Sequence, residues 1–138
     1  MQENEFNSWV NVGNDLHIKS TDFSDVLMST GLLTSNTSHE YFSQLMKGLA
    51  SEENILTVAQ TVKEIQTNVL QSNAISEEER VLLSNFTMLV HDGITYQLSK
   101  NDKISWLCGV GILVVIGGAL HSNPLAVISG GAIINGNC

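Results

Sequence analysis

The sequence predicts an all-α protein, a small helical bundle followed by a C-terminal Gly-rich hydrophobic helix or helical hairpin. Apolar residues recur at helical spacing between residues 21 and 98, and a capping-box sequence begins one of these segments. The last 35 residues form two uncharged apolar runs that a single proline separates. We therefore expect an acidic helical domain at 1–103 and an uncharged hydrophobic tail at 104–138, which is membrane-active or buried.

The first 50 residues predict two short helices. Residues 1–20 are expected to be irregular. A helix is expected to begin at Thr21 and to end near Gly31, while the polar segment 34–38 predicts a loop. The second short helix has apolar residues at helical spacing, namely Tyr41, Phe42, Leu45, Met46 and Leu49.

Two longer helices are expected next. Ser51 and the two glutamates after it predict the start of a helix that extends through Gln71. Its apolar stripe consists of Ile55, Val58, Ala59, Val62, Ile65 and Val69. Ser76 and Glu79 form a capping-box pattern, which predicts a helix that extends to about Leu98 and bends or breaks at Gly93.

The tail contains two apolar runs of unequal length. Residues 104–120 form a run of 17 residues, which as a helix measures about 26 Å, just short of a hydrocarbon core of ~30 Å. The polar segment 121–123 and Pro124 predict a break, and the second run, 124–134, is too short to span alone. Three arrangements stay open: one marginal transmembrane helix, a hairpin that enters the bilayer and turns back, or a hairpin buried in a soluble bundle.

The tail is rich in glycine, with seven of the 11 glycines of the chain. Glycine inside a helix in water costs about 0.5–1 kcal/mol relative to alanine, whereas small residues let helices pack closely in lipid. The composition therefore favours membrane insertion or close helix contact. The residues expected to carry insertion are Trp106, Gly111, Val114, Val115, Gly117, Gly118, Pro124, Gly130 and Gly131.

The residues before the tail predict its relation to a membrane. Lys100, Lys103 and Trp106 are the residue types that anchor a helix at the membrane interface, and the lysines would place 1–103 on the cytoplasmic side. The acidic N-terminus has no apolar run typical of a standard secretory signal. We therefore expect a membrane-associated protein, either exported by another route or held at the cytoplasmic face.

Cys108 and Cys138 stand at the two ends of the apolar tail. A hairpin that turns near residues 122–124 brings these ends together, so the pair is a candidate disulfide in an oxidising compartment. The alternative is two free thiols, one of them buried as a small apolar side chain.

The remaining composition excludes several classes of function. All 20 charged residues lie between Glu3 and Lys103, and the net charge of −8 argues against nucleic-acid binding. The four histidines, at positions 17, 39, 91 and 121, share no metal-ligand spacing. No set of residues combines a nucleophile with a base. We expect no enzymatic activity, no cofactor and no metal.

The last quarter of the chain resembles two classes of membrane-active protein. Its segments Gly109-Val-Gly111, Gly117-Gly-Ala119 and Gly130-Gly-Ala132, with Pro124 between them, resemble the apolar hairpin of colicin-type pore-forming domains. They are also similar to the Gly-rich segment of small bacteriocin precursors. This resemblance is one of composition and hairpin layout.

These observations lead to one principal expectation about function and two alternatives. The protein is expected to be toxin-like or bacteriocin-like, with a hairpin that inserts into a lipid bilayer and perturbs it. Permeabilisation would require a homo-oligomer, because one short hairpin cannot line a pore. The first alternative is a C-terminally anchored regulatory or immunity protein that binds a helical partner. The second is a soluble helical oligomer that buries the tail.

Overall fold

A computed structural model describes residues 1–51, 54–100 and 105–138, and within these ranges the chain is all-helical, as predicted. The described residues form seven helices: α1 (Glu3–Gly13), α2 (Phe23–Thr30), α3 (Asn36–Ala50), α4 (Ile55–Gln71), α5 (Glu77–Leu98), α6 (Trp106–Leu120) and α7 (Pro124–Ile134).

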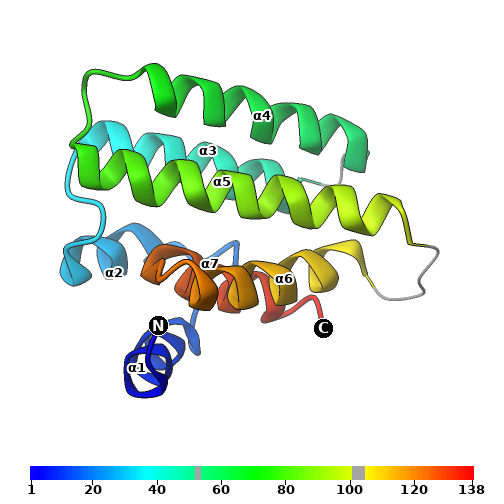
Figure 1. Cartoon of the computed structure of the whole chain (residues 1–138), viewed down its shortest axis with the longest axis horizontal. Helices are drawn as coiled ribbons and strands as arrows, with labels where there is room; N and C mark the ends of the chain where they lie inside the picture. Colours follow the sequence, from blue (N-terminus) through cyan, green and yellow to red (C-terminus); the bar gives the residue numbers. More distant parts are fainter. Residues whose placement is uncertain (52–53, 101–104) are drawn as a thin grey trace.

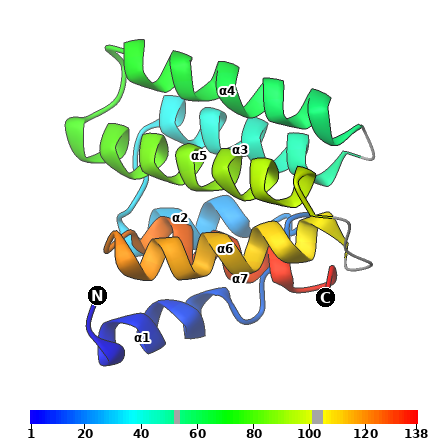
Figure 2. The ribbon, with the colours of Figure 1, turned by 45° about the vertical axis from the view of Figure 1, so that its right-hand side comes forward.

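The helices are stacked in layers (Figures 1 and 2). α4 lies on the outside, α5 and α3 form the next layer, and α6 and α7 lie beneath them. α1 covers the opposite side of the α6–α7 pair. α7 contacts α1, α5 and α6, so the last helix of the chain lies between helices from its beginning and its middle.

One hydrophobic core extends through both the charged part of the chain and the uncharged tail. Phe42 and Phe86 stack with ring centroids 6.1 Å apart, and Phe23 packs against Phe42 at 5.0 Å. Buried residues of α6 and α7, among them Val114 and Ile128, belong to the same cluster. Since all these side chains form one contiguous core, the tail is an integral part of the bundle.

The N-terminal segment differs from the prediction, because residues 3–13 form a helix where we expect irregular chain. Glu3 and Glu5 lie in its first turn, where acidic side chains interact favourably with the helix dipole. The segment has few strong helix formers, and its stability comes from packing on α7. Its contacts are with residues of α7, which lie more than 100 positions further along the chain. No local sequence pattern therefore predicts this helix.

Two predicted helix boundaries are also corrected. The side chain of Ser35 accepts a hydrogen bond from the backbone N–H of Ser38, so α3 begins inside the predicted loop. Ser51 ends α3 and does not begin α4, whose N-cap is Asn54. The two glutamates that follow Ser51 in the prediction lie outside the described residues. Polar residues favour both loops and caps, which explains why composition alone misplaced these ends.

α5 is continuous through Gly93, contrary to the expected bend. A Cβ atom built on Gly93 would lie 3.5 Å from the Cα of Val110. A Cβ atom there would make ordinary van der Waals contact with α6, and the glycine does not interrupt the helix.

Among the described residues, every helix is either too short or insufficiently apolar to cross a bilayer.

Candidate functional site: the buried tail hairpin

The tail forms a helical hairpin, one of the arrangements that the sequence leaves open. α6 and α7 are joined at His121–Asn123, where Ser122 has a left-handed φ of 51°. Asn123 is the N-cap of α7, because its Oδ1 accepts a hydrogen bond from the N–H of Ala126 at 3.2 Å. Pro124 occupies the first helical position, where its missing N–H costs nothing.

Three of the predicted glycines bring the two helices of the hairpin into backbone contact. A Cβ atom on Gly130 would lie 2.9 Å from the backbone nitrogen of Val115, and one on Gly118 would lie 3.0 Å from that of Val127. A Cβ atom on Gly111 would lie 2.9 Å from a side-chain carbon of Ile134. A larger residue at any of these positions would require the facing helix or its side chains to shift, so the glycines permit the close α6–α7 packing.

The other predicted insertion residues have different surroundings. Gly117 faces Leu89 of α5, and Gly131 has open space where a side chain would lie. Val114 is fully buried, whereas Val115 is half-buried against Gly130. Trp106 is half-buried at the start of α6. Lys103, the second predicted interface lysine, lies outside the described residues.

A disulfide joins Cys108 to Cys138, with the two Cα atoms 5.1 Å apart. Both cysteines belong to the hairpin, one in the first turn of α6 and the other after the end of α7. The bond therefore closes the hairpin on itself and makes no covalent connection to the helices that surround it.

Two asparagines connect the hairpin to the rest of the bundle. At its open end, the Asn135 Nδ2 donates hydrogen bonds to the carbonyls of Gly13, Asn14 and Leu16, at 3.2, 3.1 and 2.7 Å. At its turn, the side-chain amide of Asn123 donates to the Leu82 carbonyl of α5 at 3.1 Å. These contacts lie at the two ends of α7 and fix its position between α1 and α5.

α7 is apolar on all sides and almost completely enclosed. Eight of its 11 residues are buried, namely Leu125, Ala126, Val127, Ile128, Ser129, Gly130, Ala132 and Ile133. The Ser129 hydroxyl is buried and has no hydrogen-bond partner among the described residues, an arrangement that costs about 1–3 kcal/mol. A helix that is apolar all round is found inside a protein core or inside a membrane.

α6 is also uncharged and apolar, but one of its faces reaches solvent. Ile112, Ile116 and Leu120 are 42%, 52% and 78% exposed. Their spacing of four residues places them on one side of the helix. The opposite side packs on α5 and α7.

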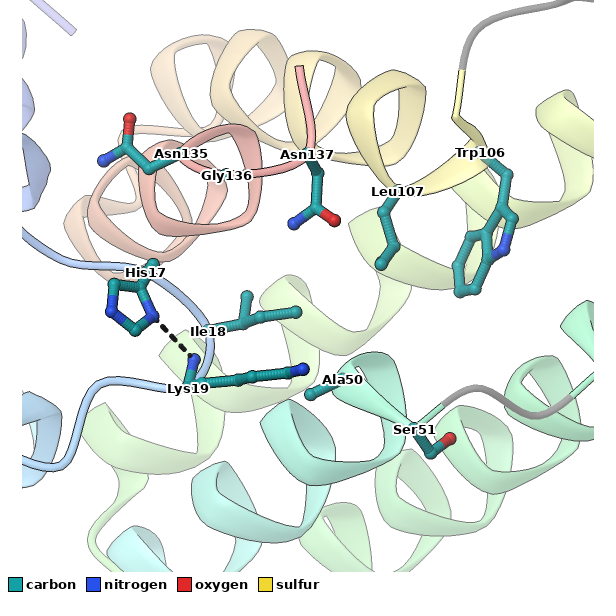
Figure 3. Close-up of a pocket in the computed structure, with 10 residues that line it drawn as sticks. All are labelled: His17, Ile18, Lys19, Ala50, Ser51, Trp106, Leu107, Asn135, Gly136 and Asn137. Carbon is teal, nitrogen blue, oxygen red and sulfur yellow. Dashed lines mark hydrogen bonds between the residues drawn. The ribbon is translucent and has the colours of Figure 1, made fainter.

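A cavity of about 370 Å³ lies at the open end of the hairpin (Figure 3). Trp106 and Leu107 of α6 form an apolar wall, and His17 and Lys19 come from the loop between α1 and α2. The backbone N–H of Lys19 donates a hydrogen bond to the Nδ1 of His17 at 3.2 Å, so the loop is ordered by its own side chain. Trp106 therefore lines this cavity and packs against the core.

Among the described residues, the ionisable group with the clearest pKa shift lies away from the hairpin. Glu79, at the start of α5, is 4% exposed. Burial raises its pKa, but hydrogen bonds from the Ser35 hydroxyl and from the N–H groups of Ser76, Ser35 and Thr34 favour the carboxylate, and together they lower the pKa to about 2. These contacts join the N-termini of α3 and α5, so Glu79 has a structural role. Within the described ranges, no three His, Cys, Asp or Glu side chains are grouped as metal ligands.

Sequence reasoning missed the tertiary contacts by which Asn123 and Asn135 hold the hairpin in place. Asn123 and Asn135 each carry a polar amide at one end of an apolar run, and that position was their only signal. Gly13 was missed as well; a Cβ atom there would lie 2.9 Å from the Ile128 carbonyl oxygen. Its role depends on the contact between α1 and α7, which the prediction of irregular chain did not include.

Comparisons with protein-family models, with curated proteins and with solved structures find no match to this chain.

Proposed function

We propose that this protein is a small toxin-like or bacteriocin-like membrane-active protein, which stores an uncharged hairpin in its core and inserts it into a lipid bilayer. The observation that carries the proposal is α7, an uncharged helix apolar on every side and enclosed by other helices. Leaving the bundle for hydrocarbon would expose no charged side chain of α7 to lipid, so insertion avoids the largest cost that a membrane imposes.

The length of the hairpin suggests how deeply it enters. With 15 and 11 residues, α6 and α7 measure about 22 and 16 Å. These lengths suit one leaflet of a hydrocarbon core of ~30 Å better than a full crossing. We infer that the hairpin wedges into one leaflet and perturbs lipid packing, and that leakage requires several copies.

The covalent structure of the hairpin is consistent with its movement as one unit. The Cys108–Cys138 bond lies entirely within the hairpin, so α6 and α7 can leave the bundle together while still paired. Only non-covalent packing, hydrogen bonds and the chain before α6 oppose this movement. Since disulfides persist in oxidising surroundings, we propose that the protein acts outside the reducing cytosol.

A crosslink between α5 and α6 tests the proposal. A Cβ atom on Gly93 would lie 3.7 Å from the Cβ of Val110, close to the ~3.8 Å that a disulfide needs. The test protein is the full chain with Gly93→Cys and Val110→Cys. It also carries Cys108→Ala and Cys138→Ser, so that the new bond is the only disulfide.

Release of a trapped dye from phosphatidylcholine vesicles is the measurement. We expect the oxidised, locked protein to be inactive and its reduced form to be as active as a protein with only Cys108→Ala and Cys138→Ser. The wild type keeps its native disulfide, so it shows whether the presence of a disulfide by itself prevents dye release. Equal release by the locked and reduced proteins would show that the hairpin need not leave the bundle.

Two other functions predict different results in the same assay. An anchored helical protein that binds a regulatory or immunity partner would associate stably with vesicles and release no dye. An oligomer that buries its tail would bind no vesicles and would elute as a multimer in size-exclusion chromatography. Either result with the wild-type protein would contradict the membrane-perturbing function and support the corresponding alternative.

A further inference from the structure

We propose that the outward face of α6, formed by Ile112, Ile116 and Leu120, is the surface by which this protein first docks on a bilayer. The inference rests on the proposed function and specifies where membrane contact begins. In Figures 1 and 2, α6 lies between α5 and α1, with α7 packed against it. The rest of the hairpin is largely enclosed, so α6 is the part of the hairpin that lipid can reach before any rearrangement.

The chemistry of this face fits hydrocarbon. Its three exposed side chains are aliphatic, and α6 has no charged residue from Trp106 to Leu120. Protein interfaces draw their affinity from buried aromatic and arginine side chains, and their orientation from a polar rim. The three exposed side chains of the α6 face include neither an aromatic anchor nor an arginine. Lipid chains require neither.

The small area of the face argues against a second copy of this chain as its occupant. The exposed fractions of 42%, 52% and 78% together amount to less than two fully exposed side chains. A stable dimer uses about 20–30 residues on each side of its interface. The same small area is sufficient for weak and reversible adsorption to a membrane, which is what a first docking step requires.

Docking through α6 leads directly to insertion of the hairpin. α6 and α7 are joined by their turn, by close backbone contact at Gly130 and Gly118, and by the Cys108–Cys138 disulfide. Movement of α6 into the bilayer therefore pulls on α7. Because the protein has a net charge of −8, docking should be stronger on neutral lipid than on anionic lipid.

Two double variants of the full chain, with the native disulfide kept, test this surface. The first carries Ile116→Gln and Leu120→Gln. The matched control carries Leu56→Gln and Leu70→Gln on α4, whose side chains are 57% and 55% exposed and lie outside the hairpin. Because all four positions are exposed, both variants should fold, and circular dichroism with thermal unfolding verifies this.

Binding is measured by co-sedimentation with phosphatidylcholine vesicles, and dye release is measured separately. We expect the α6 variant to lose about tenfold or more in partition coefficient and the α4 variant to stay within about twofold of wild type. Adding anionic phospholipid to the vesicles should weaken wild-type binding.

The outcomes separate this inference from the proposed function. If both variants bind like wild type and wild type releases dye, docking occurs elsewhere and the inference is wrong, although the function stands. If only the α6 variant loses binding but wild type releases no dye, the docking surface is correct and membrane perturbation is not. A wild-type protein that binds no vesicles overturns the inference. It is also overturned if wild type is a dimer in analytical ultracentrifugation and the α6 variant is a monomer.

Discussion

The side-chain amide of Asn123 donates a hydrogen bond to the Oδ1 of Asn85 at 2.8 Å, which joins the turn of the hairpin to the middle of α5. The two residues are 38 positions apart. Asn123 is 3% exposed, and its Oδ1 caps α7 while its Nδ2 binds α5. One side chain thus both begins α7 and fixes its position.

Replacing Asn123 separates these two roles. We expect Asn123→Ala to lower the free energy of unfolding by about 2–3 kcal/mol, because the cap is lost and the Leu82 carbonyl of α5 loses its donor. Asn123→Ser keeps a capping oxygen but is too short to reach α5, and should recover about 1 kcal/mol. Urea unfolding measures both values. If serine and alanine destabilise equally, Asn123 does not act as a cap.

The glycine contacts predict opposite effects at adjacent positions of α7. Gly130→Ala should destabilise the protein by about 1–3 kcal/mol, since the added methyl group would lie 2.9 Å from the Val115 backbone nitrogen. Gly131→Ala meets open space and should stabilise the helix by about 0.5–1 kcal/mol. Thermal unfolding of the two variants gives the comparison. A stabilising Gly130→Ala would mean that the α6–α7 packing is looser than described.

The buried carboxylate of Glu79 predicts a pH dependence of stability. Its pKa falls from an ordinary value of 4.5 to about 2 in the folded protein. The carboxylate contributes its full stabilisation above about pH 4.5 and loses it as the pH falls towards 2. This change corresponds to about 3 kcal/mol.

Comparison with Glu79→Gln isolates this effect from the other acidic residues. The wild type should exceed the variant in free energy of unfolding at pH 7, and the difference should shrink by about 3 kcal/mol between pH 5 and pH 2. Urea unfolding at several pH values tests this. A difference that does not change with pH would mean that Glu79 stabilises the fold by packing alone.

The disulfide predicts a loss of stability on reduction. Its cysteines are 30 residues apart, and closing a loop of that length stabilises a protein by about 3–4 kcal/mol on the chain-entropy model. Wild type should lose this amount in a reducing buffer. The variant with Cys108→Ala and Cys138→Ser should be equally stable in both buffers. If wild type is unaffected, either the bond does not form in the purified protein or it stabilises the unfolded chain equally.

The sequence predicts features correctly where they depend on residues that are close together in the chain. The Ser76–Glu79 capping box is present, with both of its hydrogen bonds formed, and the break at Pro124 lies at the start of α7. Both depend on residues within three positions of each other, so they can be recognised from the sequence without knowledge of the fold. α1 and the contacts of Asn135 could not be predicted, because each depends on a partner about 120 positions away.

The same distinction applies within the candidate site. Gly111, Gly118 and Gly130 were selected on composition, and the structure gives them a common role in close helix contact. Gly131, selected on the same grounds, contacts nothing where a side chain would lie. Composition identifies a Gly-rich interface, but only helix rotation determines which glycines face it. That rotation is set by packing against α1 and α5.

The position of α7 at the centre of the core has a consequence for how the protein acquires its shape during translation. The ribosome produces α1 to α6 before α7, so the surrounding helices exist before the element that fills the space between them. At about 5–20 residues per second, the growing chain spends seconds with its inner apolar surfaces uncovered. The core is therefore complete only once α7 has emerged, and we expect cooperative folding of the whole bundle to wait for it.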